Sequence, residues 1–250
     1  MKKIKTGLVI LALYLAFVLL LSPAALWLKL VPLPASVQLG PVSGTVWQGQ
    51  VQALSVQGLT LSDLKWQLNP WLLFTGKLAL TLEAGQPRQT QLPSLKTELR
   101  FGFDSMQVRQ LQARLPVSLL QPALQLPLPV GLDGAVLLKI PELEWSTAGC
   151  QQLQGLVSWL DAKVQPPTGW IGLGTLDGQL SCADNQLQLV TQPSPPLHLE
   201  VTALVSPAGR YRLDGFIKPD SSMPQDVHQA MQFVGKADAQ GRFPVRLGSR

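Results

Sequence analysis

The stretches 77–83 (KLALTLE) and 95–101 (LKTELRF) alternate leucine, threonine or phenylalanine with a charged or small residue. The same alternation recurs at 64–68, 111–115 and 186–189. Side chains of a β-strand point alternately to opposite faces, so this pattern indicates strands with one buried and one hydrated face. Gly, Pro and Asp-Gly pairs between these stretches are typical of turns. The sequence therefore predicts a mainly β protein built on an antiparallel sheet.

A single helical turn is expected inside this β region. Asn69 can accept a backbone hydrogen bond as a cap, and Pro70 suits the first helical position. Trp47 and Trp66 precede this turn and Trp71 lies within it, and we expect all three to pack on the apolar face of the sheet. Stacking on a ligand is the alternative interpretation of these rings.

The N-terminus predicts a membrane anchor. Lys2, Lys3 and Lys5 precede residues 6–28, which contain no charge and would span about 34 Å as a helix. Lysines ahead of an apolar span favour a cytoplasmic N-terminus. A cleaved signal peptide is the competing interpretation, because Ser22-Pro23-Ala24 offers small residues near a cleavage position. Either interpretation exports the rest of the chain.

The expected organisation follows from these boundaries. Residues 1–5 form a cytoplasmic tail, residues 6–28 a transmembrane helix and residues 29–40 a linker. Residues 41–250 form a periplasmic β-rich domain. The Pro-rich stretch near residue 128 divides this domain into two halves of one sheet, with two separate domains as the alternative.

Cys150 and Cys182 are the two cysteines of the 250-residue chain. In an oxidising compartment they favour a disulfide, with two buried free thiols as the alternative. Neither belongs to a CxxC pair or has a histidine nearby, so a redox or zinc site is not indicated.

Charge and motifs argue against several functions. Lys2, Lys3, Lys5 and Lys29 account for four of the five net positive charges, so the remainder offers no basic stripe to a nucleic acid. The acidic pair Glu142 and Glu144 is better explained by a solvated strand face than by acid–base catalysis. His198 and His228 lack ligand neighbours, and no GxSxG or GK[ST] motif is present. We expect no enzyme activity, no cofactor and no metal.

One region carries a family resemblance. It comprises GTVWQG at 44–49, Gly58-Leu59 and LKWQLNPWLLFTGKL at 64–78. Together with the N-terminal anchor and GKADAQGR at 235–242, it resembles the protein N family of the bacterial type II secretion system. The cysteine pair also fits that family. The same Gly-Thr-Val-Trp and Pro-Trp-Leu-Leu pattern is similar to the wider AsmA-like group.

The resemblance implies a non-catalytic accessory protein of the bacterial inner membrane with a single N-terminal span and a periplasmic domain. Its partners would be the inner-membrane platform subunits and the outer-membrane secretin, which together export folded proteins. AsmA-like kinship implies a curved, groove-forming sheet with an apolar inner face, stiffened by the disulfide. Two hypotheses follow: a secretion subunit that binds neighbours, for example at strand edges, or a lipid-binding or lipid-transfer module.

Overall fold

The structure is a computed structural model. It describes residues 10, 14, 17, 18, 21–30, 34, 36–56, 59–85, 92–119, 131–165, 169–225, 227, 228, 231 and 235–248. Lys2, Lys3 and Lys5 lie outside this set, as does much of the predicted anchor. Among the described residues, no helix combines the length and the apolar character needed to cross a membrane.

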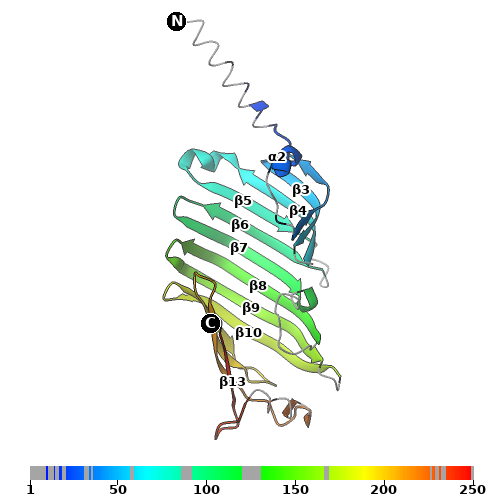
Figure 1. The fold of residues 1–250 in the computed structure, drawn as a ribbon, viewed down its shortest axis with the longest axis vertical. Coiled ribbons are helices and arrows are strands. Elements are labelled where there is room, and N and C mark those ends of the chain that lie inside the picture. Colours follow the sequence, from blue (N-terminus) through cyan, green and yellow to red (C-terminus); the bar gives the residue numbers. More distant parts are fainter. Residues whose placement is uncertain are drawn as a thin grey trace.

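The chain folds into one antiparallel meander of fourteen strands (Figure 1). The elements are α2 (Ala24–Leu30), β1 (Val37–Leu39), β2 (Val42–Gly44), β3 (Gln48–Val56), β4 (Leu59–Asn69), η1 (Pro70–Thr75), β5 (Leu78–Ala84), β6 (Ser94–Phe101), β7 (Ser105–Pro116), β8 (Gly131–Ser146), β9 (Gly149–Gln165), β10 (Ile171–Ala183), β11 (Gln186–Gln192), β12 (Glu200–Val205), β13 (Tyr211–Ile217) and β14 (Phe243–Gly248). From β3 to β14 each strand pairs with its neighbours in sequence, while β1 and β2 both pair with β3. The predicted antiparallel β architecture is confirmed.

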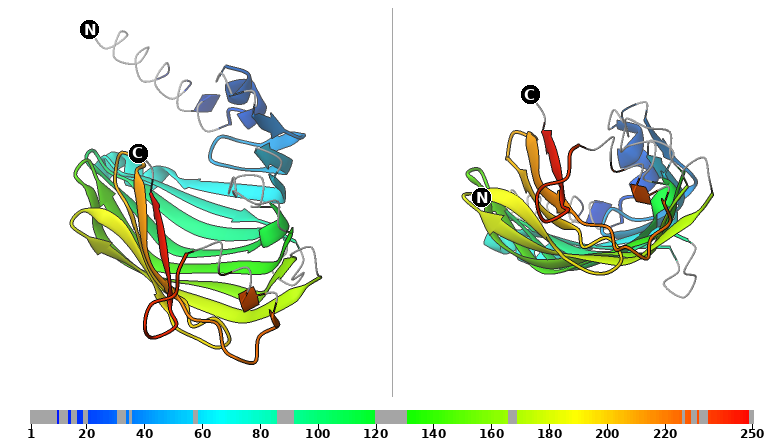
Figure 2. Two further views of the ribbon diagram at one scale, coloured as in Figure 1. Left: turned by 60° about the horizontal axis from the view of Figure 1, so that its bottom comes forward. Right: turned by 90° about the horizontal axis from the view of Figure 1, so that it is seen from below.

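The sheet is open and strongly curved. Figure 2 shows it from below as a trough, with α2 and β14 on opposite rims. Register shifts interrupt the pairing of β6 with β7, β8 with β9 and β9 with β10. Asp63, Gln110 and Asp161 adopt positive φ angles within strands. Bulges of this kind bend a strand and increase its twist, so they account for the curvature.

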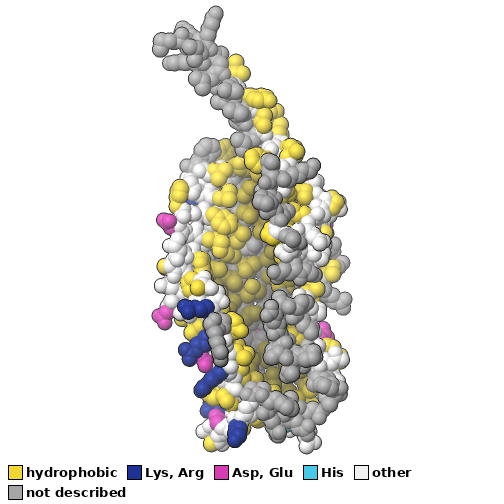
Figure 3. Space-filling view, in the orientation of Figure 1, with side chains coloured by type: hydrophobic (Ala, Val, Ile, Leu, Met, Phe, Trp, Pro, Cys, Tyr) yellow, Lys and Arg dark blue, Asp and Glu magenta, His cyan; other side chains and the backbone are white. Residues whose placement is uncertain are grey.

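Register places apolar residues in one row and polar residues in the adjacent row. The apolar row from β4 to β9 is Leu68, Leu80, Leu99, Val108, Leu143 and Leu153. The neighbouring row is Gln67, Thr81, Glu98, Arg109, Glu142 and Gln154. Successive residues face opposite sides of a sheet, so one face is apolar and the other polar. Figure 3 looks onto the apolar side, which is hollowed along its length; we call it the concave face.

Two buried clusters lie on this face. One surrounds Cys150, Ile140 and Leu153. Cys150 at the start of β9 forms a disulfide with Cys182 at the end of β10, which confirms the predicted pairing. The second cluster combines Ala162 and Leu173 of the sheet with Leu197, Met223 and Val227 from later in the chain. The predicted joint near residue 128 lies outside the described residues, and β7 pairs directly with β8 on either side of it.

We expect the disulfide to make a measurable contribution to stability. It closes a loop with a sequence separation of 32 residues, for which the chain-entropy model gives about 3.5–4 kcal/mol. The double variant Cys150→Ser/Cys182→Ser should lose about that free energy of unfolding, measured by urea titration of the full chain with tryptophan fluorescence. Dithiothreitol should lower the stability of the wild-type chain similarly and leave the double variant unchanged. Equal stability of oxidised wild type and double variant would contradict the expectation.

Candidate functional site

The concave face is the most extensive candidate site. Its central leucines are half-buried rather than enclosed, including Leu80, Leu82, Leu99 and Leu138. An apolar sheet face of this extent is ordinarily covered by a second layer, a partner or an apolar ligand. Thr97 adds a buried hydroxyl that has no hydrogen-bond partner among the described residues. The site therefore suits apolar contacts and offers little for polar recognition.

One end of the concave face is closed by two stretches outside the strands, one carrying Leu197 and the other Met223; together we call them the closing segment. Their side chains pack with Leu173 of β10. Asp220 donates its backbone N–H to the Pro196 carbonyl oxygen at 2.8 Å. Its carboxylate Oδ1 lies 3.0 Å from His198 Nε2. These contacts fasten two parts of the segment to each other over the end of the sheet.

The closing segment was not predicted from the sequence. Leu197 and Met223 are far apart in the chain, and neither belongs to an alternating stretch. The sequence gives His198 no neighbouring cluster of ligand residues, and its pairing with Asp220 has no local signal. His198 and Asp220 are 22 residues apart in the sequence, so only the tertiary fold brings them together.

The opposite end of the sheet is organised by the GTVWQG turn. Thr45 donates its backbone N–H to the Gln48 carbonyl oxygen at 2.8 Å, which closes the turn. Val46 N–H donates to the Ser22 carbonyl oxygen at 3.2 Å, and Pro23 forms a bridge with Thr45. The turn thus joins the segment that leads into α2 to the first strands of the sheet.

Trp66 fastens this turn from β4. Its indole Nε1–H donates to the Val46 carbonyl oxygen at 3.0 Å, and its ring is half-buried over Gly49. Trp47 is half-buried within the turn itself. The backbone N–H of Leu68 donates to the Trp47 carbonyl oxygen at 2.6 Å, so the turn also contacts the end of β4.

The prediction that Trp71 packs on the sheet is wrong, because 77% of its surface is exposed. Asn69 caps η1 by accepting the Trp71 backbone N–H at 3.1 Å, and Pro70 occupies the first turn. The strand alternation ends at Asn69, so Trp71 leaves the pleat of the sheet. The sequence contained this signal in Asn69-Pro70, which correctly predicted the helical turn.

The polar face carries cross-strand ion pairs. Lys96 Nζ lies 2.6 Å from Glu83 Oε1, and Arg109 Nη2 lies 3.4 Å from Glu142 Oε1. The hydrogen bond from Lys96, reinforced by its charge, lowers the pKa of Glu83. A hollow of about 460 Å³, lined in part by Lys65 and Glu83, opens beside the GTVWQG turn. Exposed pairs of this kind contribute little stability, and they keep this face hydrated.

The part of the chain that the structure describes offers no candidate metal site. It contains no cluster of three or more His, Cys, Asp or Glu residues able to hold a metal ion. Glu142 and Glu144 lie on the polar face opposite Gln154 and Gln152 of β9. This position corresponds to the solvated strand face expected from their spacing.

Comparison with known proteins shows the family of the chain. The family described as "Type II secretion system (T2SS), protein N" matches residues 35–246. The chain belongs to this family. The matched region extends from just before β1 into β14, so it includes both clusters of the concave face.

Three protein N relatives are similar over most of their length. The type II secretion system protein N of Pectobacterium carotovorum is 32% identical, with 99% of both chains covered. That of Aeromonas hydrophila is 30% identical over 100% of this chain and 99% of its own. That of Vibrio cholerae is 28% identical, with 89% and 88% covered. No solved structure matches the chain.

We expect the GTVWQG turn to tolerate no side chain at Gly49. A methyl group there would overlap the Trp66 ring and the Ser43 carbonyl oxygen. Gly49→Ala should therefore lower the free energy of unfolding by about 2 kcal/mol or more. Gly172→Ala is the matched control, because a methyl group at Gly172 meets nothing within 4 Å. Urea unfolding of both variants tests this, and equal stabilities would contradict it.

Proposed function

We propose that this protein N family member is a non-catalytic accessory subunit of a type II secretion system. It supports export of folded proteins from the periplasm across the outer membrane. The observation that carries the proposal is the family match over residues 35–246, together with relatives named type II secretion system protein N. Its partners are the inner-membrane platform subunits and the secretin.

The proposed location is the bacterial inner membrane. Residues 6–28 act as a single span, Lys2, Lys3 and Lys5 hold the N-terminus in the cytoplasm, and residues 41–250 lie in the periplasm. The Cys150–Cys182 disulfide supports a periplasmic location, because such bonds persist in oxidising compartments.

The faces of the sheet are better suited to subunit contacts than its edges. At one edge, β1 and β2 are three residues long. At the other edge, β14 carries Pro244 and Arg246. Short edge strands, proline and charge all hinder the addition of another strand. We therefore assign partner binding to the two faces and their rims.

Co-purification tests the proposal. The tagged full-length chain, gently extracted from its native membrane, should retain platform subunits or the secretin at stoichiometric levels by quantitative mass spectrometry. A tagged single-span protein of unrelated function, extracted in the same way, serves as the control. Recovery no greater than in the control would contradict the secretion role.

A second candidate function is lipid binding on the concave face. In the part of the chain that the structure describes, its leucines are half-buried, apolar side chains are visible along the hollow in Figure 3, and Leu197 and Met223 pack over one end. Acyl chains bound there would cover the apolar side chains and remove their surface area from water, which is favourable. The protein would then bind or transfer lipid between membranes.

Substitutions at two adjacent residues of β5 distinguish lipid binding from a purely structural role of the concave face. Leu80→Gln places an amide on the concave face, whereas Thr81→Gln places the same side chain on the polar face. We expect Leu80→Gln to lower the lipid retained per chain several-fold and Thr81→Gln to leave it unchanged, measured by native mass spectrometry. Thermal unfolding of both variants controls for folding. Equal lipid retention by the two variants, or none in the wild type, would exclude this candidate.

A further inference from the structure

Exposed aromatic and leucine side chains gather at one end of the molecule. They come from three places: the segment leading through α2, the η1 turn after β4 and the turn between β6 and β7. We call them the aromatic rim, which comprises Leu21, Leu26, Trp27, Trp71, Leu73 and Phe103. The exposed fractions are 50% for Trp27, 77% for Trp71 and 92% for Phe103.

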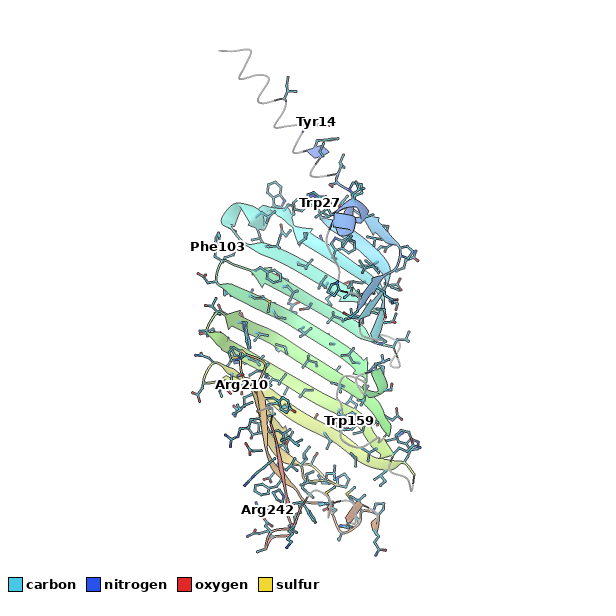
Figure 4. The ribbon with its side chains drawn as sticks, viewed as in Figure 1. Tyr14, Trp27, Phe103, Trp159, Arg210 and Arg242 are labelled. Carbon is cyan, nitrogen blue, oxygen red and sulfur yellow. A yellow bond between two sulfur atoms is a disulfide. The ribbon has the colours of Figure 1, made fainter. Side chains whose placement is uncertain are left out.

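Backbone and ring contacts connect the three parts of the rim. Pro23 forms an isolated β-bridge with Thr45 of the GTVWQG turn. Trp47 of the same turn accepts a backbone hydrogen bond from Leu68, near the end of β4. The η1 turn begins two residues later and is capped by Gly76, where an added methyl group would meet the Phe103 ring. Figure 4 shows Trp27 and Phe103 at the same end of the sheet, toward the side from which Tyr14 projects.

We propose that the aromatic rim rests in the interfacial layer of the lipid bilayer from which the chain emerges. Three of its members, Leu21, Leu26 and Trp27, lie in the last part of the uncharged stretch 6–28. Tryptophan has an apolar ring and a polar N–H, and it concentrates at the boundary between hydrocarbon and water. This inference rests on the proposed inner-membrane location.

The rim chemistry fits a lipid surface. In residues 70–77 and 102–104, the charged residues are Lys77, which precedes Leu78, and Asp104, which follows Phe103. Seating the rim would hold the first strands against the membrane, with the later strands extending away from it (Figure 1). The concave face would then begin at the membrane surface.

Site-specific fluorescence tests the contact in the full-length chain. Because Cys150 and Cys182 are bonded to each other, an introduced cysteine is the free thiol available for an environment-sensitive nitrobenzoxadiazole label. Trp71→Cys and Phe103→Cys report the rim. Trp170→Cys is the matched control, since Trp170 is 51% exposed but precedes β10, six strands along the sheet from β4. The chains are reconstituted in vesicles of phosphatidylethanolamine and phosphatidylglycerol.

We expect labels at positions 71 and 103 to emit at shorter wavelength and to be quenched several-fold more by doxyl lipids than the label at 170. Quenching at 71 and 103 no greater than at 170 would overturn the inference. A blue shift without doxyl quenching would also overturn it, because protein rather than lipid would then cover the rim.

A fourth variant, Tyr14→Cys, reports the anchor separately. Quenching at position 14 without quenching at 71 and 103 would leave the membrane location standing and overturn only the rim contact. Absence of quenching at position 14 would refute the proposed location. Quenching at 71 and 103 in that case would still support a lipid-binding rim.

Discussion

The register between neighbouring strands is the constraint on which the rest of the structure depends. A slip of one residue between β5 and β6 would set Leu80 opposite Glu98 or Arg100 and mix the two faces. Because each strand pairs with the next, such an error would carry through every later row. The apolar row from Leu68 to Leu153 and the polar row from Gln67 to Gln154 therefore specify the register together. The cross-strand pair of Lys96 and Glu83 adds a charge preference to the same alignment.

Much of the fold could be predicted from local sequence, because strand alternation and turn chemistry are local signals. Leu78 to Leu82 and Leu95 to Phe101 predicted two strands that pair as β5 and β6. The capped turn at Asn69-Pro70 could also be predicted from the sequence, but the exposure of Trp71 that results from it was not predicted. Curvature was expected from resemblance alone. Its local causes at Asp63, Gln110 and Asp161 occur at residues other than glycine, where sequence carries little indication of a positive φ angle.

The candidate site was only partly predictable. The apolar concave face follows from the alternating leucines, whereas the segment that closes its end depends on long-range packing of Leu197 and Met223 with Leu173. The disulfide followed from composition and compartment. The GTVWQG turn was noted as a family pattern, and the structure supplies its physical role: Trp66 and Ser22 both bond to Val46, which ties the N-terminal segment to the sheet.

Pairing between sequence neighbours also sets an order of assembly. Each hairpin of the meander can form from residues that are close in the chain, so the sheet can grow strand by strand as the chain emerges N-terminus first. Leu197 and Met223 come after β11 and therefore reach the concave face late. Until they arrive, the growing trough is open at that end as well as along its length. During assembly, the apolar concave face is therefore accessible to a ligand or a chaperone. The closing segment then covers one end of that face.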